Sequence, residues 1–448
     1  MPLTACIFLV LYFTGLIMTF RYPYIGIATY IFLWHNHPPY MWWGDPLPDL
    51  RWSLVISVVT LISLIINYNG LPSLRKSNYT LIWWLVALTI WMYFVSAFCA
   101  VDPVESYRKA ETFCKFTVQA FLMMFLLRTI KQYKFVIWTF ILNVANFGKI
   151  AYERGSNRYL GVMAPNSGEE NAIAAHVTAM IPFFGLYFLT GKKWVKIITM
   201  VSLPFLLNLI ILSNSRASFL TLAILGILTF FWIRGRLRWR VLLALFAGAL
   251  LVLFLANDTF WERQKTMTEH QDEGASGSRF LLWRGALEMS ADHPLGVGGE
   301  GFEALVFSYV PELTETMEEA GAKAVHNTFL TVLVEWGYVG LILFTGFLIH
   351  TFLILKKIRR DGKRAAKYLC CHIDAVSIQL GLIGILVAGL FHSRLYSEVF
   401  YWFAAFAVAL RNIQVNEIAE EIEDTATVGT TASIHGPYED YRPEVVYE

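Results

Sequence analysis

Charged residues are scarce in this chain. Only 16% of its 448 residues are Asp, Glu, Lys or Arg, whereas 56% are hydrophobic, and soluble domains typically carry about 25% charged residues. The shortage recurs along the chain in separate apolar blocks, of roughly the 17–25 residues that a bilayer core requires. A soluble globular protein has no place for so much apolar surface. The composition therefore excludes a soluble domain and predicts a polytopic membrane protein.

Cysteines are also few, and their placement argues against a disulfide-bonded protein and against a cysteine metal site. The five cysteines all lie in or beside apolar blocks, and none lies between residues 258 and 327. They are expected to be small buried residues that form neither a disulfide framework nor a metal site. The net charge of +2 does not point to nucleic acid, and no motif points to a cofactor.

Thirteen apolar blocks predict an all-α fold with 12 or 13 transmembrane helices. The block at 22–34 is short for a full span, which leaves the number open. The first block follows no basic segment and has no cleavage site, so it is expected to be a retained helix. The blocks fall near 3–20, 22–34, 52–67, 80–99, 112–127, 135–150, 171–190, 197–213, 217–233, 241–257, 328–355, 372–391 and 397–410.

The distribution of charge predicts the orientation. Alternate connections hold 19 basic residues and a single acid, Asp361, and the positive-inside rule assigns such connections to the cytoplasm. The connections between them then face outwards, and among these only 258–327 is long enough to fold. The basic residues lie at 75–76, 128–134, 192–196, 234–240 and 356–367.

Four parts follow from this topology. Residues 1–257 form helices 1 to about 10, residues 258–327 a large extracytoplasmic loop with short helices, residues 328–410 the last transmembrane helices, and residues 411–448 a cytoplasmic tail. The tail is acidic and rich in Thr, Pro and Tyr, which predicts disorder. Within the loop, 278–289 predicts an amphipathic helix that lies on the membrane, and 294–301 (PLGVGGEG) predicts a turn-rich break.

Arg216 is the clearest candidate for chemistry on the outer face. It lies in NSRASFL, a connection of about three residues between two helices, where the positive-inside rule disfavours a basic residue. One interpretation is an anchor that reaches the lipid headgroups. The other is an anion site at a helix N-terminus, where the helix dipole adds to the charge of the side chain.

Two more arginines lie in the predicted loop helix, Arg279 at its start and Arg284 one and a half turns later. Such residues are often only solvated. Arginines can nevertheless bind a diphosphate through bidentate hydrogen bonds without a metal. No pair of carboxylates on the outer face has the spacing of a metal site.

His326 lies where the long loop re-enters the membrane, in VHNTFLTVLVEWGYVGL. It is either a helix cap or a residue able to take up a proton near neutral pH. Glu335 follows nine residues later, roughly 13 Å deeper in a straight helix. An intramembrane carboxylate is either functional or paired with a basic group, for which Lys115 is one candidate. Glu169 and Glu170 are further candidate bases on the outer face.

Several stretches together carry a resemblance. They are RYPYIGIATYIFLWHNHPP, RYLGVMAPNSGEENAIA, LSNSRASFLTL, and the long loop from WERQKTM to GEGFEAL with its exit helix VHNTFLTVLVEWGYVGLI. In this order they resemble the O-antigen ligase and polymerase superfamily of bacterial inner-membrane glycosyltransferases. They are most similar to the O-glycosylation ligases associated with exosortase. The similarity extends over about residues 5–410.

The resemblance implies an inverting, metal-independent glycosyltransferase with the C-type fold. Two arginines that hold the diphosphate and a histidine at the acceptor hydroxyl correspond to Arg216, Arg279 and His326. The branch often has Gly before the second arginine, where this chain has Ser278. It also often has a second histidine just before His326, where this chain has Val325. A role that needs a second histidine is therefore not expected.

The leading interpretation is a glycosyl ligase of the bacterial inner membrane, with its active site facing the periplasm. Its donor is a saccharide on undecaprenyl diphosphate, and its acceptor is a lipid or a protein. Arg284 is a further candidate for binding the diphosphate. A repeat-unit polymerase of the same fold is the nearest alternative. A transporter of lipid-linked saccharides is the alternative from another class, although no internal repeat typical of transporters is visible.

Overall fold

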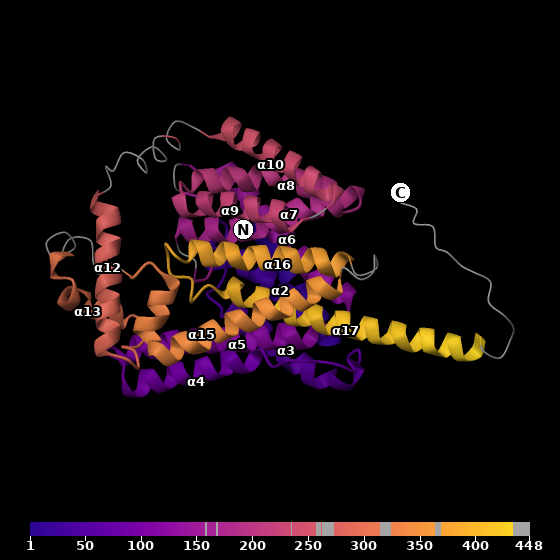
Figure 1. Cartoon of the computed structure of the whole chain (residues 1–448), viewed down its shortest axis with the longest axis horizontal. Coiled ribbons are helices and arrows are strands. Elements are labelled where there is room, and N and C mark those ends of the chain that lie inside the picture. Colours follow the sequence, from indigo (N-terminus) through magenta and orange to yellow (C-terminus); the bar gives the residue numbers. More distant parts are fainter. Residues whose placement is uncertain are drawn as a thin grey trace.

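A computed structural model describes residues 1–156, 159–166, 169–233, 235–256, 261, 273–313, 324–362 and 369–432. This part of the chain contains fifteen α-helices (Figure 1). They are α1 (Leu3–Arg21), α2 (Pro23–His35), α3 (Trp52–Ile66), α4 (Ile82–Phe98), α5 (Pro103–Leu126), α6 (Ile130–Arg154), α7 (Glu170–Thr190), α8 (Lys193–Leu212), α9 (Arg216–Trp232), α10 (Arg236–Leu255), α12 (Glu273–Asp292), α13 (Gly301–Tyr309), α15 (Thr328–Asp361), α16 (Leu369–Ala388) and α17 (Glu398–Ala432).

Thirteen of these helices coincide with the thirteen apolar blocks of the sequence, which confirms the predicted all-α polytopic architecture. Seven of the described helices are long and apolar enough to cross a membrane, namely α1, α6, α7, α8, α10, α15 and α16. Three more, α3, α4 and α9, are apolar but shorter. α2 has 13 residues and is as short as predicted. α5 and α17 complete the thirteen, and the remaining two helices, α12 and α13, belong to the long loop.

Burial separates the central helices from the peripheral ones. Every residue of α17 from Val399 to Leu410 is buried, as expected for an apolar helix that other helices surround. α10 is the opposite case, because Val241 and Val252 are the only buried residues of that helix. Its exposed apolar surface is suited to lipid and not to water.

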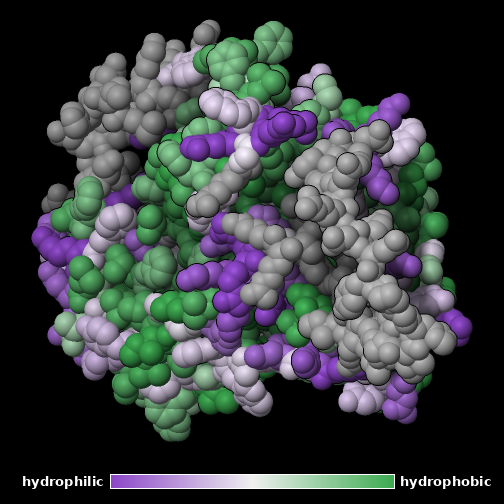
Figure 2. All heavy atoms as spheres, turned by 45° about the vertical axis from the view of Figure 1, so that its right-hand side comes forward, coloured by the Kyte–Doolittle hydropathy of each residue, from purple (hydrophilic) through white to green (hydrophobic). Residues whose placement is uncertain are grey.

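The two ends of the bundle differ in the elements that they carry. The long helices run side by side, α12 lies across one end, and α17 projects from the other (Figure 1). We call these the α12 end and the α17 end. Basic connections meet at the α17 end, where Arg128 donates to the carbonyl of Pro72 (3.1 Å) and Arg411 pairs with Asp361 (2.7 Å). Figure 2 shows hydrophilic residues gathered toward this end and hydrophobic residues over the flanks. The side of the membrane that each end faces stays a prediction.

The structure corrects the predicted start of the disordered tail. α17 continues as a helix to Ala432. Its polar residues are bonded to the connection between α3 and α4, since Asn412 accepts from the N–H of Asn78 (2.9 Å) and Asn416 donates to the carbonyl of Lys76 (2.7 Å). These amide contacts explain why a polar segment continues the helix. The last residues of the predicted tail, 433–448, lie outside the described part of the chain.

α15 is broken near its start, which its apolar block does not predict. Gly337 has φ 67° and ψ −171°, outside the helical region. The ring of Phe329 lies 6.1 Å from that of Phe344, fifteen residues later, whereas a straight helix would separate these residues by about 22 Å. The chain therefore reverses at Gly337, and the segment 328–336 folds back beside the longer second part. Glu335 lies before the break, so it does not continue in the direction of the long second part of α15.

The predicted turn at 294–301 packs against this break. The N–H groups of Val297 and Gly298 donate, both at 2.9 Å, to two carbonyls of α15 that the break deprives of helical partners. A Cβ atom at Gly337 would come within 2.4 Å of the carbonyl oxygen of Pro294. Glycine is needed here both for this close approach and for the left-handed φ. Parts of the long loop, 257–260, 262–272 and 314–323, lie outside the described residues.

Candidate active site

Arg216 is the first residue of α9, at the α12 end of the bundle. The hydroxyl of Ser215 caps the helix by accepting from the N–H of Ser218 (3.4 Å). Asn214 has φ 48°, a left-handed conformation that Asn adopts more readily than most residues. This turn joins α8 to α9 within three residues. Arg216 thus starts at the positive end of the helix dipole, where an anion is favoured.

Arg279 comes from α12 and lies within electrostatic range of Arg216. Burial, and after it the positive charge of Arg216, lowers the pKa of Arg279. Two like charges in a partly buried place repel each other unless an anion offsets them. The two predicted arginines therefore interact electrostatically, and such a pair suits a multiply charged anion.

One hydrogen bond links α12 to the chain before α15. The indole Nε1 of Trp283 donates to the carbonyl of Val325 (3.1 Å), which immediately precedes His326. Arg279 lies one turn before Trp283, so both side chains lie on the same side of α12. The bond therefore holds Arg279 toward His326.

His326 has φ 54°, a conformation that is uncommon outside glycine and often found at functional sites. The cap of α15 is its neighbour, Asn327, whose side chain accepts from the N–H groups of Phe329 (3.0 Å) and Leu330 (3.2 Å). The capping role considered for His326 therefore belongs to Asn327.

A second histidine comes from the connection between α16 and α17. The ring of His392 lies 5.3 Å from that of His326, edge to face. Its Nδ1 atom lies 3.9 Å from a carboxylate oxygen of Glu169. Burial, followed by the charges of Arg394, His326 and Arg279, lowers the pKa of His392 to about 3. The imidazole is therefore neutral near pH 7.

Arg394 lies in the same connection and holds it in place. Only 9% of its surface is exposed. Its guanidinium donates to the carbonyl of Asn171 (3.1 Å), and its N–H donates to the hydroxyl of Thr328 (2.9 Å). Burial lowers its pKa to about 10, although a nearby carboxylate opposes this shift. His392 and Arg394 were not predicted from the sequence. Residues 392–394 (HSR) form a short polar connection between two apolar blocks, as NSR does at residues 214–216. The same argument that pointed to Arg216 could therefore have pointed to them.

The two predicted carboxylates before α7 differ in their surroundings. Glu169 lies at the start of the helix with a side chain that is 67% exposed, and it approaches His392. Glu170 is half-buried and has no such contact among the described residues. Only Glu169 therefore belongs to the cluster of histidines and arginines.

Arg284 lies apart from the other two arginines. It is five residues from Arg279 and therefore about 140° further around α12. Its guanidinium is half-exposed and pairs with Glu312 (2.7 Å) and Glu288 (3.5 Å). The predicted contact of Arg284 with a diphosphate has no support in this geometry. Arg284 instead joins α12 to the short 3-10 helix Pro311–Leu313.

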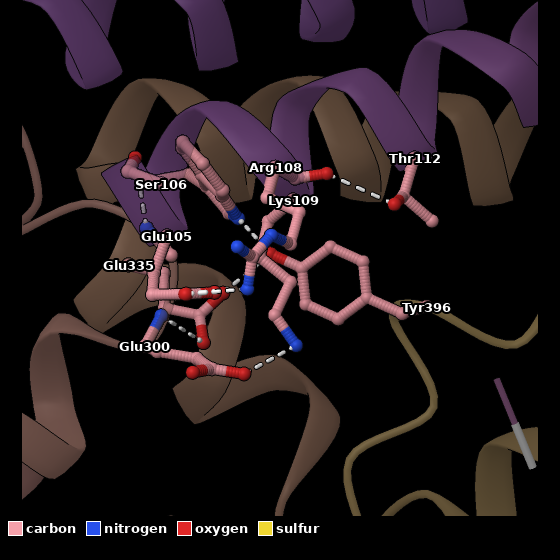
Figure 3. Close-up of polar contacts among 10 residues, drawn as sticks. Glu105, Ser106, Arg108, Lys109, Thr112, Glu300, Glu335 and Tyr396 are labelled. Carbon is pink, nitrogen blue, oxygen red and sulfur yellow. Dashed lines mark hydrogen bonds and ion pairs between the residues drawn. The ribbon is translucent and has the colours of Figure 1, made fainter. Parts of the chain in front are cut away.

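Glu335 belongs to a second polar cluster (Figure 3). Its carboxylate accepts from the hydroxyl of Tyr396 (2.7 Å) and from the N–H of Glu300 (3.4 Å). The nearest cation, Lys109, pairs with Glu300 (2.6 Å). The partner suggested from the sequence, Lys115, instead pairs with an acid one turn earlier on α5 (2.7 Å). This cluster joins α5, α13, α15 and the connection before α17.

A groove of about 860 Å³ lies between α15, α16 and the end of α9. Its lining is mainly apolar and begins with Phe329, three residues after His326. It continues along α15 through Phe352 to Arg359. A groove of this kind suits a hydrocarbon chain.

The fold and the cluster define a class. This is a polytopic membrane protein whose α12 end carries paired arginines and histidines, a combination suited to an anionic substrate at a membrane surface. Residues 200–345 match the family model described as O-antigen ligase, so this part of the chain is similar to that family. The matched segment contains Arg216, Arg279 and His326. No curated protein matches the chain.

Proposed function

We propose that this protein is a glycosyl ligase that transfers a saccharide from undecaprenyl diphosphate to an acceptor hydroxyl. The match of residues 200–345 to the O-antigen ligase family model supports glycosyl transfer of the ligase or polymerase type. The observation that carries the finer proposal is the convergence of Arg216, Arg279 and His326 at one end of a membrane bundle. Paired guanidinium groups suit a diphosphate, and a histidine suits a hydroxyl that must lose its proton.

In the proposed reaction, the acceptor oxygen bonds to the anomeric carbon as the bond from that carbon to the diphosphate breaks. The electron pair leaves on the diphosphate, where Arg216 and Arg279 stabilise the developing charge. The dipole of α9 adds to this stabilisation. His326 takes the hydroxyl proton. Attack from the side opposite the leaving group inverts the anomeric centre, and arginines in place of a cation make the step metal-independent.

The apolar groove beside α15 is the proposed seat of the polyprenyl chain. It begins close to His326 and is open on the flank of the bundle, so a lipid can enter from the membrane. A chain in this groove would present its diphosphate to the arginines. The α12 end would then face the periplasm, and the α17 end, with the basic connections, the cytoplasm of the bacterial inner membrane.

The decisive experiment uses the purified protein in detergent, with a saccharide on undecaprenyl diphosphate and candidate acceptors. A product with one saccharide on a lipid or protein acceptor supports the ligase. A ladder of repeat units that remain on the lipid carrier indicates the polymerase. Absence of any product, with movement of the donor across proteoliposomes, would indicate a transporter. Comparison of envelope lipids, exopolysaccharide and secreted proteins with and without this protein identifies the acceptor.

A further inference from the structure

His392 has no part in the reaction described above, yet it lies between His326 and the surface. Its ring is 5.3 Å from the ring of His326, and its Nδ1 atom is 3.9 Å from the carboxylate of Glu169. The exposed fraction of the side chain rises from 14% for His392 to 67% for Glu169. The three side chains come from separate connections and form a line from the site to water.

We infer that His392 is a proton relay, which carries the proton that His326 takes from the acceptor to Glu169 and so to water. This inference rests on the proposed function, because it concerns the fate of the proton released in that reaction. A base that keeps its proton cannot serve a second turnover. Removal of the proton is therefore a requirement of the cycle.

The proton balance of the relay is simple. His326 gains the proton as the new glycosidic bond forms, and the leaving electron pair stays on the diphosphate. His392 accepts this proton on one ring nitrogen and releases another from Nδ1 to Glu169. An imidazole can do this because its two nitrogens are donor and acceptor in turn. One water molecule can bridge either gap, with little loss compared with a direct hydrogen bond.

The charges around His392 favour the release of a proton from its ring over its retention there. It faces Arg279 from α12, His326 before α15, Glu169 before α7, and Arg394 of its own connection. Three of these groups are or become cations, so a proton on His392 is repelled. The carboxylate of Glu169 is the acid–base group on the exposed side. A proton that reaches His392 is therefore driven outwards.

The connection that carries His392 is fixed to α15 at both ends. The carbonyl of Gly389 accepts from the N–H of Thr328 (2.7 Å), and the hydroxyl of Tyr396 donates to Glu335 (2.7 Å). The ring of His392 is thus held beside His326 by contacts that do not involve the ring. The Glu335 cluster therefore helps to position the connection that carries His392.

The test compares His392→Gln and Glu169→Gln with the wild-type protein at saturating donor. We expect His392→Gln to lower kcat by about 10-fold or more, toward the lower end of the range for proton-transfer groups, with donor affinity unchanged. Added imidazole should restore kcat in proportion to its concentration, because a diffusible base replaces the relay. Glu169→Gln should show a smaller loss that buffer also restores, and its exposure makes misfolding an inadequate explanation.

Matched controls are His293→Gln and Glu153→Gln. Both residues lie outside the cluster, and neither variant should change kcat or respond to imidazole. A loss in His392→Gln that imidazole does not restore, or weaker donor binding with unchanged kcat, would overturn the relay while leaving glycosyl transfer intact. A wild-type protein that transfers no saccharide would instead overturn the proposed function itself.

Discussion

Arg216 and Arg279 place two like charges in a partly buried site, where a bound anion would reduce the repulsion between them. Lysine keeps the charge but loses the planar fork that bridges two phosphate oxygens. We expect Arg216→Lys to lower kcat/KM by about 10²-fold, or ~3 kcal/mol, as for the loss of one transition-state donor. Arg279→Lys should behave alike in the same steady-state assay.

The control for this pair is Arg284→Lys. Arg284 pairs with Glu312 on the surface of the long loop, and exposed pairs contribute little. Its lysine variant should therefore retain wild-type transfer. Near wild-type rates for Arg216→Lys would favour the interpretation of Arg216 as an anchor at the lipid headgroups.

His326 differs from the arginines in the step that it serves. We expect His326→Ala to lower kcat by ~10²–10⁴-fold, the usual contribution of a positioned base, while the protein still binds the donor. Donor binding measured by titration, beside kcat at saturating donor, separates the two roles. Loss of donor binding with unchanged turnover would make His326 a binding residue, and Glu169 and Glu335 the next candidates for the base.

The site was only partly predictable from the sequence. Arg216, Arg279 and His326 were predicted because they lie in motifs that resemble a known family and on the predicted outer side, where basic residues need another explanation. His392 was not chosen, because its neighbours in space, Glu169 and His326, lie far away in the sequence. The pattern of a single sequence does not show which distant residues come close together in the fold. The pairing of Arg284 with Glu312 was not foreseen for a related reason, since the sequence does not show which residues of the long loop lie beside each side of α12.

At the scale of the element, the break in α15 depends on one glycine. We expect Gly337→Ala to destabilise the protein by about 1–3 kcal/mol, the cost of one strained backbone conformation, because its Cβ would also meet Pro294. Thermal unfolding in detergent measures the shift. Gly185→Ala is the matched control, since no atom lies within 4 Å of its added Cβ and alanine favours helix. Equal melting temperatures for Gly337→Ala and wild type would contradict this account.

Apolar blocks located the helices well, because core or lipid surrounds most of their side chains. The apolar blocks did not reveal those turns of a helix that consist of polar residues. α5 begins at Pro103, where the side chain of Asp102 accepts two backbone N–H groups, although its apolar block starts near 112. They also did not show the break at Gly337. A glycine within an apolar run is compatible with a straight helix, and the turn that fills this break is remote in the sequence.

At the scale of the whole molecule, the charge asymmetry between the two ends predicts the orientation. Basic connections meet at the α17 end, and such residues remain in the cytoplasm. A reporter that is active only in the cytoplasm should therefore give a signal when fused after Ala432. A protease site inserted between α10 and α12 should be cut only from the outside. Activity of a periplasm-specific reporter after Ala432 would reverse the assignment.

The positive charge at the α12 end also affects whether a metal ion is needed there. The α12 end presents Arg216 and Arg279 where a diphosphate is proposed to bind, and two guanidinium groups already supply the positive charge that a leaving diphosphate requires. They also repel a divalent cation at that position. Among the described residues, no group of three or more His, Cys, Asp or Glu side chains is arranged to hold a metal ion.

We therefore expect saccharide transfer by the purified protein to continue at an unchanged rate in excess EDTA, measured as product formed per minute at saturating donor. Addition of Mg²⁺ or Mn²⁺ should have no effect beyond the screening of charge that an equal ionic strength of NaCl produces. The NaCl series is the control that separates ion binding from screening. Loss of transfer in EDTA, with recovery on one divalent ion but not on NaCl, would show that a cation and not the arginine pair carries the leaving charge.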